Sequence, residues 1–282
     1  MDITLAKTFL EIIQSGSFIA AAERLHVTQT TITTRIKTLE ELLGCQLFVR
    51  NRSGARLTDN GVRFTAYAQQ MVQTWHAAKR DLPLPEGTVN LITIGGEVSL
   101  WNPLLLQWFN CLRSELPAIA IRVEVAEADT LHKKLEGGVM DAALVHRPDY
   151  WSGMQVEELL EEKLIMVQST SKPEPYIYTD WGDYFKQQHD SALVEFAKPG
   201  LSISLGPLAL NHILEYGGSG YFRSRVVQKY IENGELAVVE ASPEFSYPIY
   251  LMYPRNKNNA VMSQVLKTLR EASKREFDWS QH

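Results

Sequence analysis

The sequence predicts an α/β protein in which an all-α N-terminal unit precedes a two-lobed α/β domain. Three observations predict this class. Apolar residues recur at helical spacing over residues 1–80, a Pro- and Gly-rich segment follows at 81–88, and strand-like runs then alternate with helical ones. The length of 282 residues is enough for two domains of ordinary size.

A pair of short helices joined by a tight turn is predicted near the N-terminus. Ser17 is the expected N-cap of a helix over 18–25, and Thr28 is the expected N-cap of the next helix, which ends at Gly44. The apolar residues of that second helix lie three or four positions apart and should face the core; they are Ile32, Ile36, Leu39 and Leu43. This is a helix-turn-helix, whose second helix can enter the major groove of DNA.

A β-hairpin, which we call the wing, is predicted to follow over 45–58. Its two runs meet at a Ser53-Gly54 turn, and the basic residues around the tip are Arg50, Arg52 and Arg56. Asp59 is the expected cap of a long helix over 60–80. The apolar stripe of that helix consists of Phe64, Tyr67, Ala68, Met71, Val72 and Trp75. This stripe either pairs two chains or packs on the first helix of its own chain.

Beyond residue 88 the pattern predicts an α/β domain with a parallel sheet. Its first strands are expected at 89–96, 120–128 and 140–146, with helices at 102–117, capped by Asn102, and at 129–138. The run 155–169 contains two strands that carry the chain into a second lobe. That lobe should hold strands near 176–181, 201–205, 220–222, 236–240 and 248–253, helices near 181–190, 206–216 and 223–232, and then a final helix over 258–276.

Charge is distributed unevenly along the chain. Residues 1–80 hold ten Lys and Arg against six Asp and Glu, which gives them a net charge of +4. Because the overall net charge is −5, the remaining residues have a net charge of −9. A basic module on an acidic body is typical of a nucleic-acid-binding unit within a larger protein, although a modest imbalance of this kind also arises by chance.

Composition argues against several other classes of protein. No run approaches the roughly 18 apolar residues that a membrane span needs, and the start MDITLAKTFLEII does not resemble a secretory signal. Cys45 and Cys111 lie far apart, and the seven histidines include no HExxH or similar metal-binding pair. We therefore expect no membrane partner, no metal or other cofactor, and a reducing cytoplasm as the compartment.

The N-terminal residues resemble a known family. The block FLEIIQSGSFIAAAERLHVTQTTITTRIKTLEELLGCQLFVRNRSGARLTDNG resembles the winged helix-turn-helix of LysR-type transcriptional regulators nearly position for position. The shared hallmarks are Ser17-Phe18, Ala21-Ala22, Leu25, Gln29, Leu39-Glu40, Leu43-Gly44, Leu47-Phe48, Arg50, Leu57-Thr58 and Gly61. The second helix begins Thr28-Gln29-Thr30-Thr31 where the family commonly has Ser-Gln-Pro-Ala or Ser-Gln-Pro-Ser, so the proline of the first turn is absent.

The resemblance implies a division of the chain and an assembly. We expect a DNA-binding domain at 1–58, a linker and dimerisation helix at 59–80, a hinge at 81–88, and an effector-binding domain at 89–282 that is similar to a periplasmic binding protein. Within the last, lobe I should span about 89–163 and 255–282, and lobe II about 164–254. The family also implies homodimers through the linker helix, homotetramers, an interrupted palindrome in promoter DNA as the operator, and contact with RNA polymerase.

The outward face of the second helix carries side chains suited to base edges. Gln29 can form two hydrogen bonds with adenine, threonines can donate, accept or contact the thymine methyl group, and Lys37 suits guanine or phosphate. The predicted DNA-binding residues are Gln29, Thr30, Thr33, Thr34, Lys37, Arg50, Arg52 and Arg56. The alternative is a merely solvated face. Arg24 and Arg35 either contact DNA or pair with Glu23 or Glu40.

The resemblance places a ligand cleft between the lobes, where strand ends and helix N-termini meet. The predicted effector-binding residues are Ser99, Thr130, His146, Arg147, Ser202 and Ser204. Each has a structural alternative, because Ser99 and Thr130 can be simple caps, Arg147 a solvated charge and His146 a packed polar residue. Likewise Trp101, Trp151 and Trp181 either line a pocket for an aromatic ligand or belong to the core.

Enzyme classes find no support in the sequence. The segment GGSGY at 217–221 is not a G-x-S-x-G nucleophile motif because Tyr221 replaces its last glycine, and there is no P-loop or dinucleotide fingerprint. The prediction is therefore a sequence-specific transcriptional regulator that responds to a small-molecule effector. A second class is a sensor whose helix-turn-helix contacts only protein, and the charge of residues 1–80 argues against it.

Overall fold

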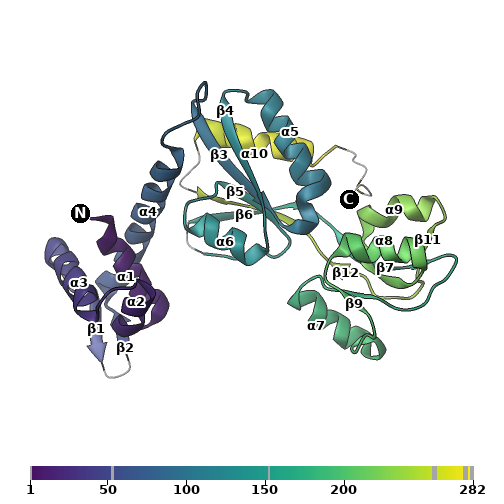
Figure 1. The fold of residues 1–282 in the computed structure, drawn as a ribbon, viewed down its shortest axis with the longest axis horizontal. Helices are drawn as coiled ribbons and strands as arrows, with labels where there is room; N and C mark the ends of the chain where they lie inside the picture. The colour runs from purple at the N-terminus through teal and green to yellow at the C-terminus, as the bar shows by residue number, and fades with distance from the viewer. Residues whose placement is uncertain (1, 52–53, 152, 256–258, 276–278, 280–282) are drawn as a thin grey trace.

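The computed structural model describes residues 2–51, 54–151, 153–255, 259–275 and 279. A small helical unit with a hairpin, a long helix and two α/β lobes follow one another along the molecule (Figure 1). The N-terminal unit consists of α1 (Ile3–Ser15), α2 (Phe18–Arg24), α3 (Gln29–Leu43), β1 (Phe48–Asn51) and β2 (Gly54–Leu57).

Capping side chains fix the ends of α2 and α3 where the sequence predicts them. The Ser17 hydroxyl accepts a hydrogen bond from Ala20 N at 3.0 Å, and the Thr28 hydroxyl accepts one from Thr31 N at 3.2 Å. Gly44 ends α3 in the left-handed conformation with φ of 66°, which glycine adopts without a Cβ clash. These caps give the helix-turn-helix its short, defined turn.

A cluster of phenylalanines forms the core of this unit. The Phe9 ring lies 5.2 Å from the Phe48 ring and 5.1 Å from the Phe64 ring, so α1, the wing and the following helix share one core. Ile32, Ile36 and Leu39 are buried as predicted, but Leu43 is 40% exposed. The prediction for Leu43 was wrong because the last turn of α3 extends beyond the core.

Helix α4 (Asp59–Asp81) leads from the N-terminal unit to the first lobe. Its N-cap is Thr58, whose hydroxyl accepts from Gly61 N at 3.0 Å, and not Asp59 as expected. Phe64 and Ala68 are buried in the core with α1, so this part of the apolar stripe packs within its own chain. Tyr67 and Trp75 remain 65% and 46% exposed.

Lobe I is built on a five-stranded sheet in the order β4-β3-β5-β13-β6. Its strands are β3 (Asn90–Gly96), β4 (Ile119–Val125), β5 (Ala142–Val145), β6 (Met154–Leu160) and β13 (Ile249–Pro254). β3 is parallel to β4 and β5, but β13 is antiparallel to β5 and β6. The predicted parallel sheet is therefore mixed, because β13 enters it from the opposite direction after the chain returns from lobe II.

Helices cover both faces of this sheet. α5 and α10 lie together on one face and α6 lies on the other (Figure 1). The elements concerned are η1 (Val98–Leu100), η2 (Trp101–Leu105), α5 (Leu106–Glu115), α6 (Ala128–Glu136) and α10 (Ala260–Ala272). Asn102 does not cap a helix as expected, since it has φ −130° and ψ 133° within an irregular turn, and the regular helix begins four residues later.

Lobe II is centred on one antiparallel strand, β7. β10 pairs with one edge of β7, and β11 and β12 pair with the other. The strands are β7 (Lys163–Ser169), β8 (Tyr178–Thr179), β9 (Ser202–Ile203), β10 (Ser219–Arg223), β11 (Leu236–Val238) and β12 (Phe245–Ser246). The helices are α7 (Asp183–Ala192), η3 (Val194–Phe196), α8 (Gly206–Tyr216) and α9 (Ser224–Glu232).

Two chain crossings connect the lobes, one between β6 and β7 and the other between β12 and β13. The second crossing comes before Ile249, because β13 pairs with β6 over its whole length and with β5 over Tyr250–Met252. The predicted end of lobe II at 254 is therefore too late, and residues 249–254 belong to the sheet of lobe I. A continuous strand pattern in the sequence does not show which of two sheets the strand joins.

We expect Gly61→Ala to destabilise the protein. A Cβ at Gly61 would overlap the carbonyl oxygen of Leu47 and lie 2.8 Å from Leu57 Cδ2, so the start of α4 would have to move away from the wing. Overpacking of this kind costs about 1–3 kcal/mol. Urea unfolding of the full chain measures the loss, with the exposed Gln70→Ala as control. A gain in stability, as the helix propensity of alanine alone would give, would contradict the expected clash.

Candidate DNA-binding face and inter-lobe cleft

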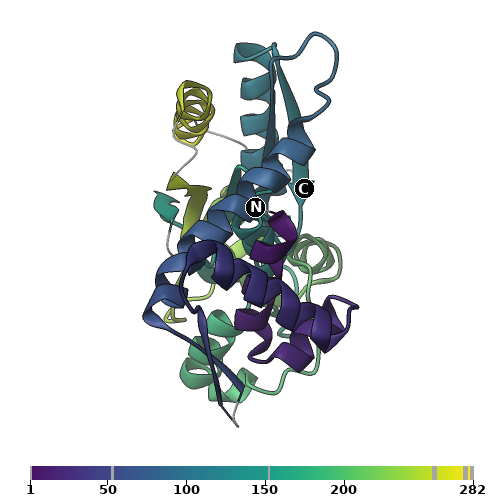
Figure 2. The same ribbon diagram turned by 90° about the vertical axis from the view of Figure 1, so that its left-hand side faces the viewer.

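The outer face of α3 is open to solvent. Gln29, Thr30, Thr34 and Lys37 are exposed, and Thr33 is partly buried. Thr30, Thr34 and Lys37 are spaced by four and three residues and so form one stripe along the helix. The wing extends beyond the helices at one end of the N-terminal unit (Figure 1, Figure 2). The helix stripe and the wing are thus both placed to contact a large surface.

Lys37 is the basic residue of α3 that remains available. It lies 3.8 Å from Glu41, but both side chains are more than 60% exposed, and such pairs contribute little to stability. Arg35 instead donates to the Thr8 hydroxyl at 3.3 Å, and Arg24 pairs with Glu11 at 3.3 Å. Neither arginine uses the partners expected from the sequence, because α1 supplies nearer ones.

The wing is held by hydrogen bonds from its backbone N–H groups. The Glu40 carboxylate of α3 accepts from Leu47 N at 2.7 Å and from Phe48 N at 3.2 Å, and Ala55 N donates to Gly16 O at 3.2 Å. These contacts fix the orientation of the hairpin relative to α3. Of the predicted wing arginines, Arg56 is exposed on β2, Arg50 lies in β1 opposite Ala55, and Arg52 lies outside the described residues.

A cleft of about 1040 Å³ lies between the two lobes. Four of the six predicted effector-binding residues line it, namely Ser99, His146, Arg147 and Ser204. The other two are not part of the lining: Thr130 is exposed in the first turn of α6, and Ser202 lies in β9 paired with β8. Trp101 and Trp181 line the cleft, whereas Trp151 contacts His132 in a separate cluster.

Several lining residues were not predicted from the sequence. The charged ones are Glu97, Glu127, Asp129, Asp180, Asp183 and Arg223, and the aromatic ones are Tyr184, Phe185, Phe222, Tyr247 and Tyr250. Two of them share a signal that could have been used, because Glu97 and Arg223 each stand where a buried strand ends. A charged residue at the end of an apolar strand is costly unless it has a partner or a ligand.

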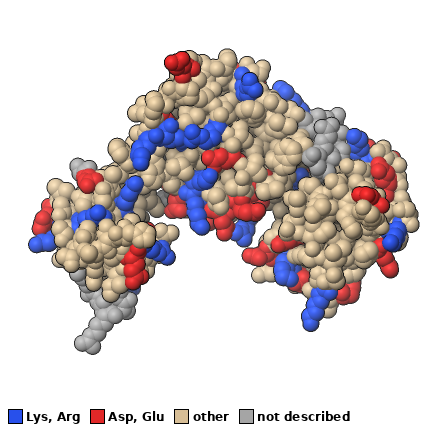
Figure 3. Space-filling view, in the orientation of Figure 1, with Lys and Arg blue, Asp and Glu red and all other residues tan. Residues whose placement is uncertain are grey.

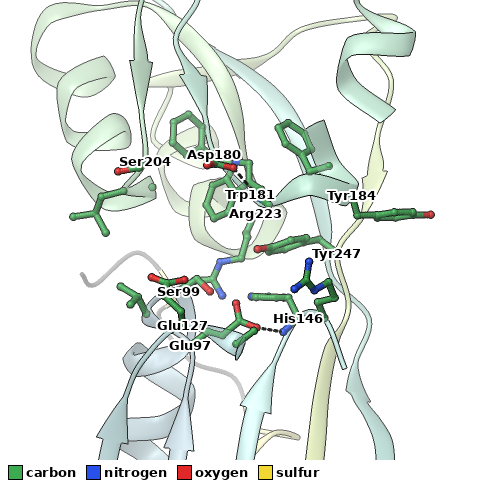
Figure 4. Close-up of a pocket in the computed structure, with 18 of the residues that line it drawn as sticks. Glu97, Ser99, Glu127, His146, Asp180, Trp181, Tyr184, Ser204, Arg223 and Tyr247 are labelled. Carbon is green, nitrogen blue, oxygen red and sulfur yellow. Dashed lines mark hydrogen bonds between the residues drawn. The ribbon is translucent and has the colours of Figure 1, made fainter. Parts of the chain in front are cut away.

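His146 is held as a neutral side chain at the base of the cleft. Its backbone N–H donates to Glu97 Oε1 at 2.7 Å (Figure 4). Its Nδ1 lies 3.1 Å from Pro248 O. A carbonyl oxygen can only accept, so Nδ1 carries the hydrogen and Nε2 is an acceptor. Burial, reinforced by Arg223, lowers the pKa of His146 to about 3. The Tyr247 ring stacks on the imidazole at 3.8 Å.

Arg223 reaches into the cleft from lobe II. Its residue exposure is 5%, and its guanidinium points toward Glu97 and Ser99 of lobe I (Figure 4). Within the described part of the chain, Nη1 of Arg223, Nε2 of His146 and the Ser99 hydroxyl are buried without a hydrogen-bond partner. Unsatisfied buried polar atoms are costly, and their convergence on one cleft is typical of a ligand site.

Carboxylates outnumber arginines in the lining. Five Asp and Glu residues line the cleft beside Arg147 and Arg223, and Arg147 is itself paired with Asp129 at 2.9 Å. The acidic side chains lie on both lobes at the border of the hollow between them (Figure 3). Burial raises the pKa of Glu97 despite hydrogen bonds from two backbone N–H groups, and Glu127 adds to the rise. The cleft therefore has a negative rim around one buried cation.

Helix α6 connects this cleft to α4. Glu127, Ala128 and Asp129 at its N-terminal end line the cleft. At its C-terminal end, Gln73 Nε2 donates to Glu136 O at 2.7 Å, and His76 Nδ1 lies 2.9 Å from Gly137 O. These carbonyls have no partners within α6, so the side chains of α4 complete the end of α6.

A buried ion pair continues the same contact. Arg80 of α4 donates to Gly138 O at 3.3 Å and to Asp141 Oδ1 at 3.3 Å, and both charged side chains are less than 10% exposed. The second oxygen of Asp141 accepts from Thr93 N of β3 at 2.7 Å. Asp141 therefore joins the sheet of lobe I to the helix that leads to the DNA-binding unit.

Comparison with known proteins identifies relatives of both parts. Residues 3–62 match the sequence model of the bacterial regulatory helix-turn-helix protein, lysR family, and residues 85–274 match that of the LysR substrate binding domain. The HTH-type transcriptional regulator HdfR of Yersinia pestis is 28% identical over 285 residues, which cover 95% of this chain and 96% of that protein.

Solved structures share the whole fold. Full-length LysG of Corynebacterium glutamicum, with bound effector Arg, has a TM-score of 0.60 at 17% identity and covers 97% of this chain and 98% of its own. CrgA, a LysR-type transcriptional regulator of Neisseria meningitidis, has a TM-score of 0.53 at 19% identity over 98% of this chain and 100% of its own. No described helix of the present structure is long and apolar enough to cross a membrane.

We expect His146→Gln to flatten the acid dependence of stability. Buried neutral His146 has a pKa of about 3, whereas an unfolded histidine titrates near 6.5. The unfolded chain therefore binds the extra proton first, and stability falls as the pH drops from about 6.5 toward 3, by at most about 1.4 kcal/mol per pH unit. Glu97, whose pKa is raised, makes a contribution of opposite sign to the pH dependence of stability, and it does so in wild type and in His146→Gln alike.

Urea unfolding at pH 7, 6 and 5 measures this difference between wild type and variant. His212→Gln, which changes a half-buried histidine on α8, is the control and should keep the wild-type slope. Equal slopes for wild type and His146→Gln would show that His146 is not held neutral.

Proposed function

The chain belongs to the LysR family of bacterial DNA-binding transcriptional regulators, and we propose that a small molecule in its inter-lobe cleft controls how it holds operator DNA. The observation that carries the proposal is the position of α6. Its first turn lines the cleft, and its last carbonyls are bound by side chains of α4, the helix that leads to the DNA-binding unit. At nine residues, α6 spans about 13 Å between the two contacts.

Sequence recognition is assigned to α3. Gln29, Thr30, Thr33, Thr34 and Lys37 contact base edges in the major groove. This role is supported by the solvent-facing stripe and by the high exposure of Lys37, whose contact with Glu41 at 3.8 Å is itself solvent-exposed. The wing contacts the phosphate backbone through Arg50, Arg52 and Arg56. Threonine has a lower helix propensity than alanine, so helix stability does not account for this composition.

Pairing of chains through α4 places two recognition helices on one duplex. Tyr67 and Trp75 remain exposed on α4, whereas Phe64, Ala68, Met71 and Val72 pack against the core of the N-terminal unit. The two exposed rings support a second copy as their partner. The operator is then an interrupted palindrome with half-sites one helical turn, or a multiple of it, apart. Two dimers join through their C-terminal domains as a homotetramer that contacts RNA polymerase in the cytoplasm.

Effector control follows from a difference in affinity between two lobe arrangements. A ligand that binds one arrangement more tightly shifts the tetramer toward that arrangement. The free energy of the shift equals the difference between the ligand's binding free energies for the two arrangements. The bend in the operator changes with the arrangement. The change reaches α4 through α6 and the Arg80–Asp141 pair. The bound effector in the related LysG structure supports this kind of control.

A catalytic role is not part of the proposal. In the described cleft, the Ser99 hydroxyl has no hydrogen-bond partner, and the protonated nitrogen of His146 is directed to Pro248 O. A serine nucleophile needs a base within hydrogen-bond distance and a base needs a group that orients it, so this pair is arranged for binding.

Selection from random duplex DNA tests the recognition helix. We expect wild type to recover an interrupted palindrome, and Thr30→Ala and Thr34→Ala to lose about 1–3 kcal/mol of discrimination at inner positions. Lys37→Ala should weaken binding, and Thr74→Ala, an exposed threonine of α4, should change nothing. Weak binding without a motif, lost at moderate salt, would leave phosphate attraction alone and favour a sensor that contacts protein.

The variant Arg80→Gln tests the connection between α4 and α6. Removing the guanidinium leaves Asp141 buried without its charged partner, and we expect a loss of about 3–5 kcal/mol in urea unfolding and faster hydrogen exchange of the α6 amides. Lys79→Gln, an exposed neighbour, is the control and should stay within about 0.5 kcal/mol. Unchanged exchange in α6 would rule out this route.

A further inference from the structure

We propose that the cleft binds a small amino acid with a cationic side chain, whose carboxylate pairs with Arg223 and whose amino and cationic groups face the acceptors and carboxylates around it. This inference rests on the proposed effector role of the cleft and specifies its ligand. Three features support it in turn: a buried guanidinium, a neutral acceptor beside it, and an excess of carboxylates on the rim.

The carboxylate end is set by Arg223. Its guanidinium is buried between the lobes, and Nη1 has no hydrogen-bond partner among the described residues. None of the ion pairs formed by those residues includes Arg223. The guanidinium carbon lies 5.6 Å from the centre of the Trp279 ring, but no described carboxylate forms an ion pair with it. A buried cation without a counter-charge is costly, and a carboxylate offers it two parallel charge-assisted hydrogen bonds. An anionic group of the ligand at this point satisfies the charge that the fold leaves open.

The amino end is set by His146 and Ser99. Nε2 of His146 is a lone-pair acceptor because Nδ1 donates to Pro248 O, and the Ser99 hydroxyl likewise has no hydrogen-bond partner in the described part of the chain. Both belong to lobe I and lie opposite Arg223 across the cleft (Figure 4). An ammonium group has three donors and no acceptor, so it fits a neutral imidazole nitrogen and a hydroxyl. A second carboxylate would meet an acceptor where it needs a donor.

The excess of carboxylates around the cleft favours a cationic side chain on the ligand. After Arg147 and Asp129 are counted as a pair, Glu97, Glu127, Asp180 and Asp183 remain against Arg223 alone. The indole of Trp181 and the ring of Tyr247 also line the cleft, and aromatic faces attract cations. A simple anion would be repelled by these carboxylates, and a simple cation would leave Arg223 unpaired. A ligand with both charges meets both requirements.

Titration calorimetry with the full-length protein tests this ligand class. The probes are L-arginine, agmatine, which lacks the carboxylate, 5-guanidinopentanoate, which lacks the α-amino group, and L-norvaline, which lacks the side-chain cation. We expect L-arginine to bind at least tenfold more tightly than each of the other three. In Arg223→Gln the advantage of L-arginine over agmatine should disappear. The variant removes the guanidinium that binds the carboxylate of L-arginine, and agmatine has no carboxylate to lose.

Matched variants separate a local effect from a general loss of structure. Arg225→Gln removes a guanidinium of α9 that does not line the cleft, and it should preserve all four affinities. Glu127→Gln together with Asp183→Asn should reduce the ratio of L-arginine to L-norvaline affinity at least fivefold. Far-UV circular dichroism and urea unfolding confirm that each variant is folded before titration.

Three results would overturn the inference. They are equal binding of L-arginine and agmatine to wild type, tighter binding of 5-guanidinopentanoate than of L-arginine, and no binding of any probe. The second result, if it depends on Arg223, would still leave the cleft as an effector site for a carboxylate without an α-amino group. The proposed function is tested separately by DNA selection and by hydrogen exchange in Arg80→Gln. Neither experiment uses a ligand, so a failure of the ligand inference leaves their outcome unchanged.

Discussion

The buried contact between α4 and the α6–β5 junction holds the two halves of this regulator in one relation. Arg80 and Asp141 are both removed from solvent, and Asp141 is also bound to the backbone of β3. A buried pair of this kind contributes more to geometry than to stability, because desolvation offsets much of the attraction. The geometry of the pair matters here. It fixes α4, which carries the DNA-binding unit, relative to lobe I, which forms one wall of the cleft.

The cleft itself combines strong local charge with loose enclosure. At about 1040 Å³ it is at the upper end of the sizes found for ligand sites, so a small ligand fills it only if the lobes approach each other. Among the described residues, the buried polar atoms of the cleft without partners come from both lobes, with Arg223 on one side and Ser99 and His146 on the other. A ligand that satisfies both sides therefore favours the closed arrangement over the open one.

Features decided by neighbouring residues could be predicted from the sequence, and features decided by distant ones could not. Ser17, Thr28 and Gly44 mark helix ends because a cap acts within one turn. Leu43 and the strand at 249–254 were misplaced because their surroundings depend on where a core ends and which sheet is nearer. The position of Arg223 at the end of a buried strand could have marked it as a candidate, but its partners on lobe I follow only from how the lobes meet.

The discontinuous chain of lobe I has a consequence for how this protein could have been assembled. Ile249 at the start of β13 is the direct antiparallel partner of Leu160 at the end of β6, so the two ends between which lobe II is inserted lie side by side. A tight turn would join them and leave all five strands of the sheet in place. Lobe I is thus a complete folding unit by topology, and lobe II has the position of a domain grafted into one of its hairpins.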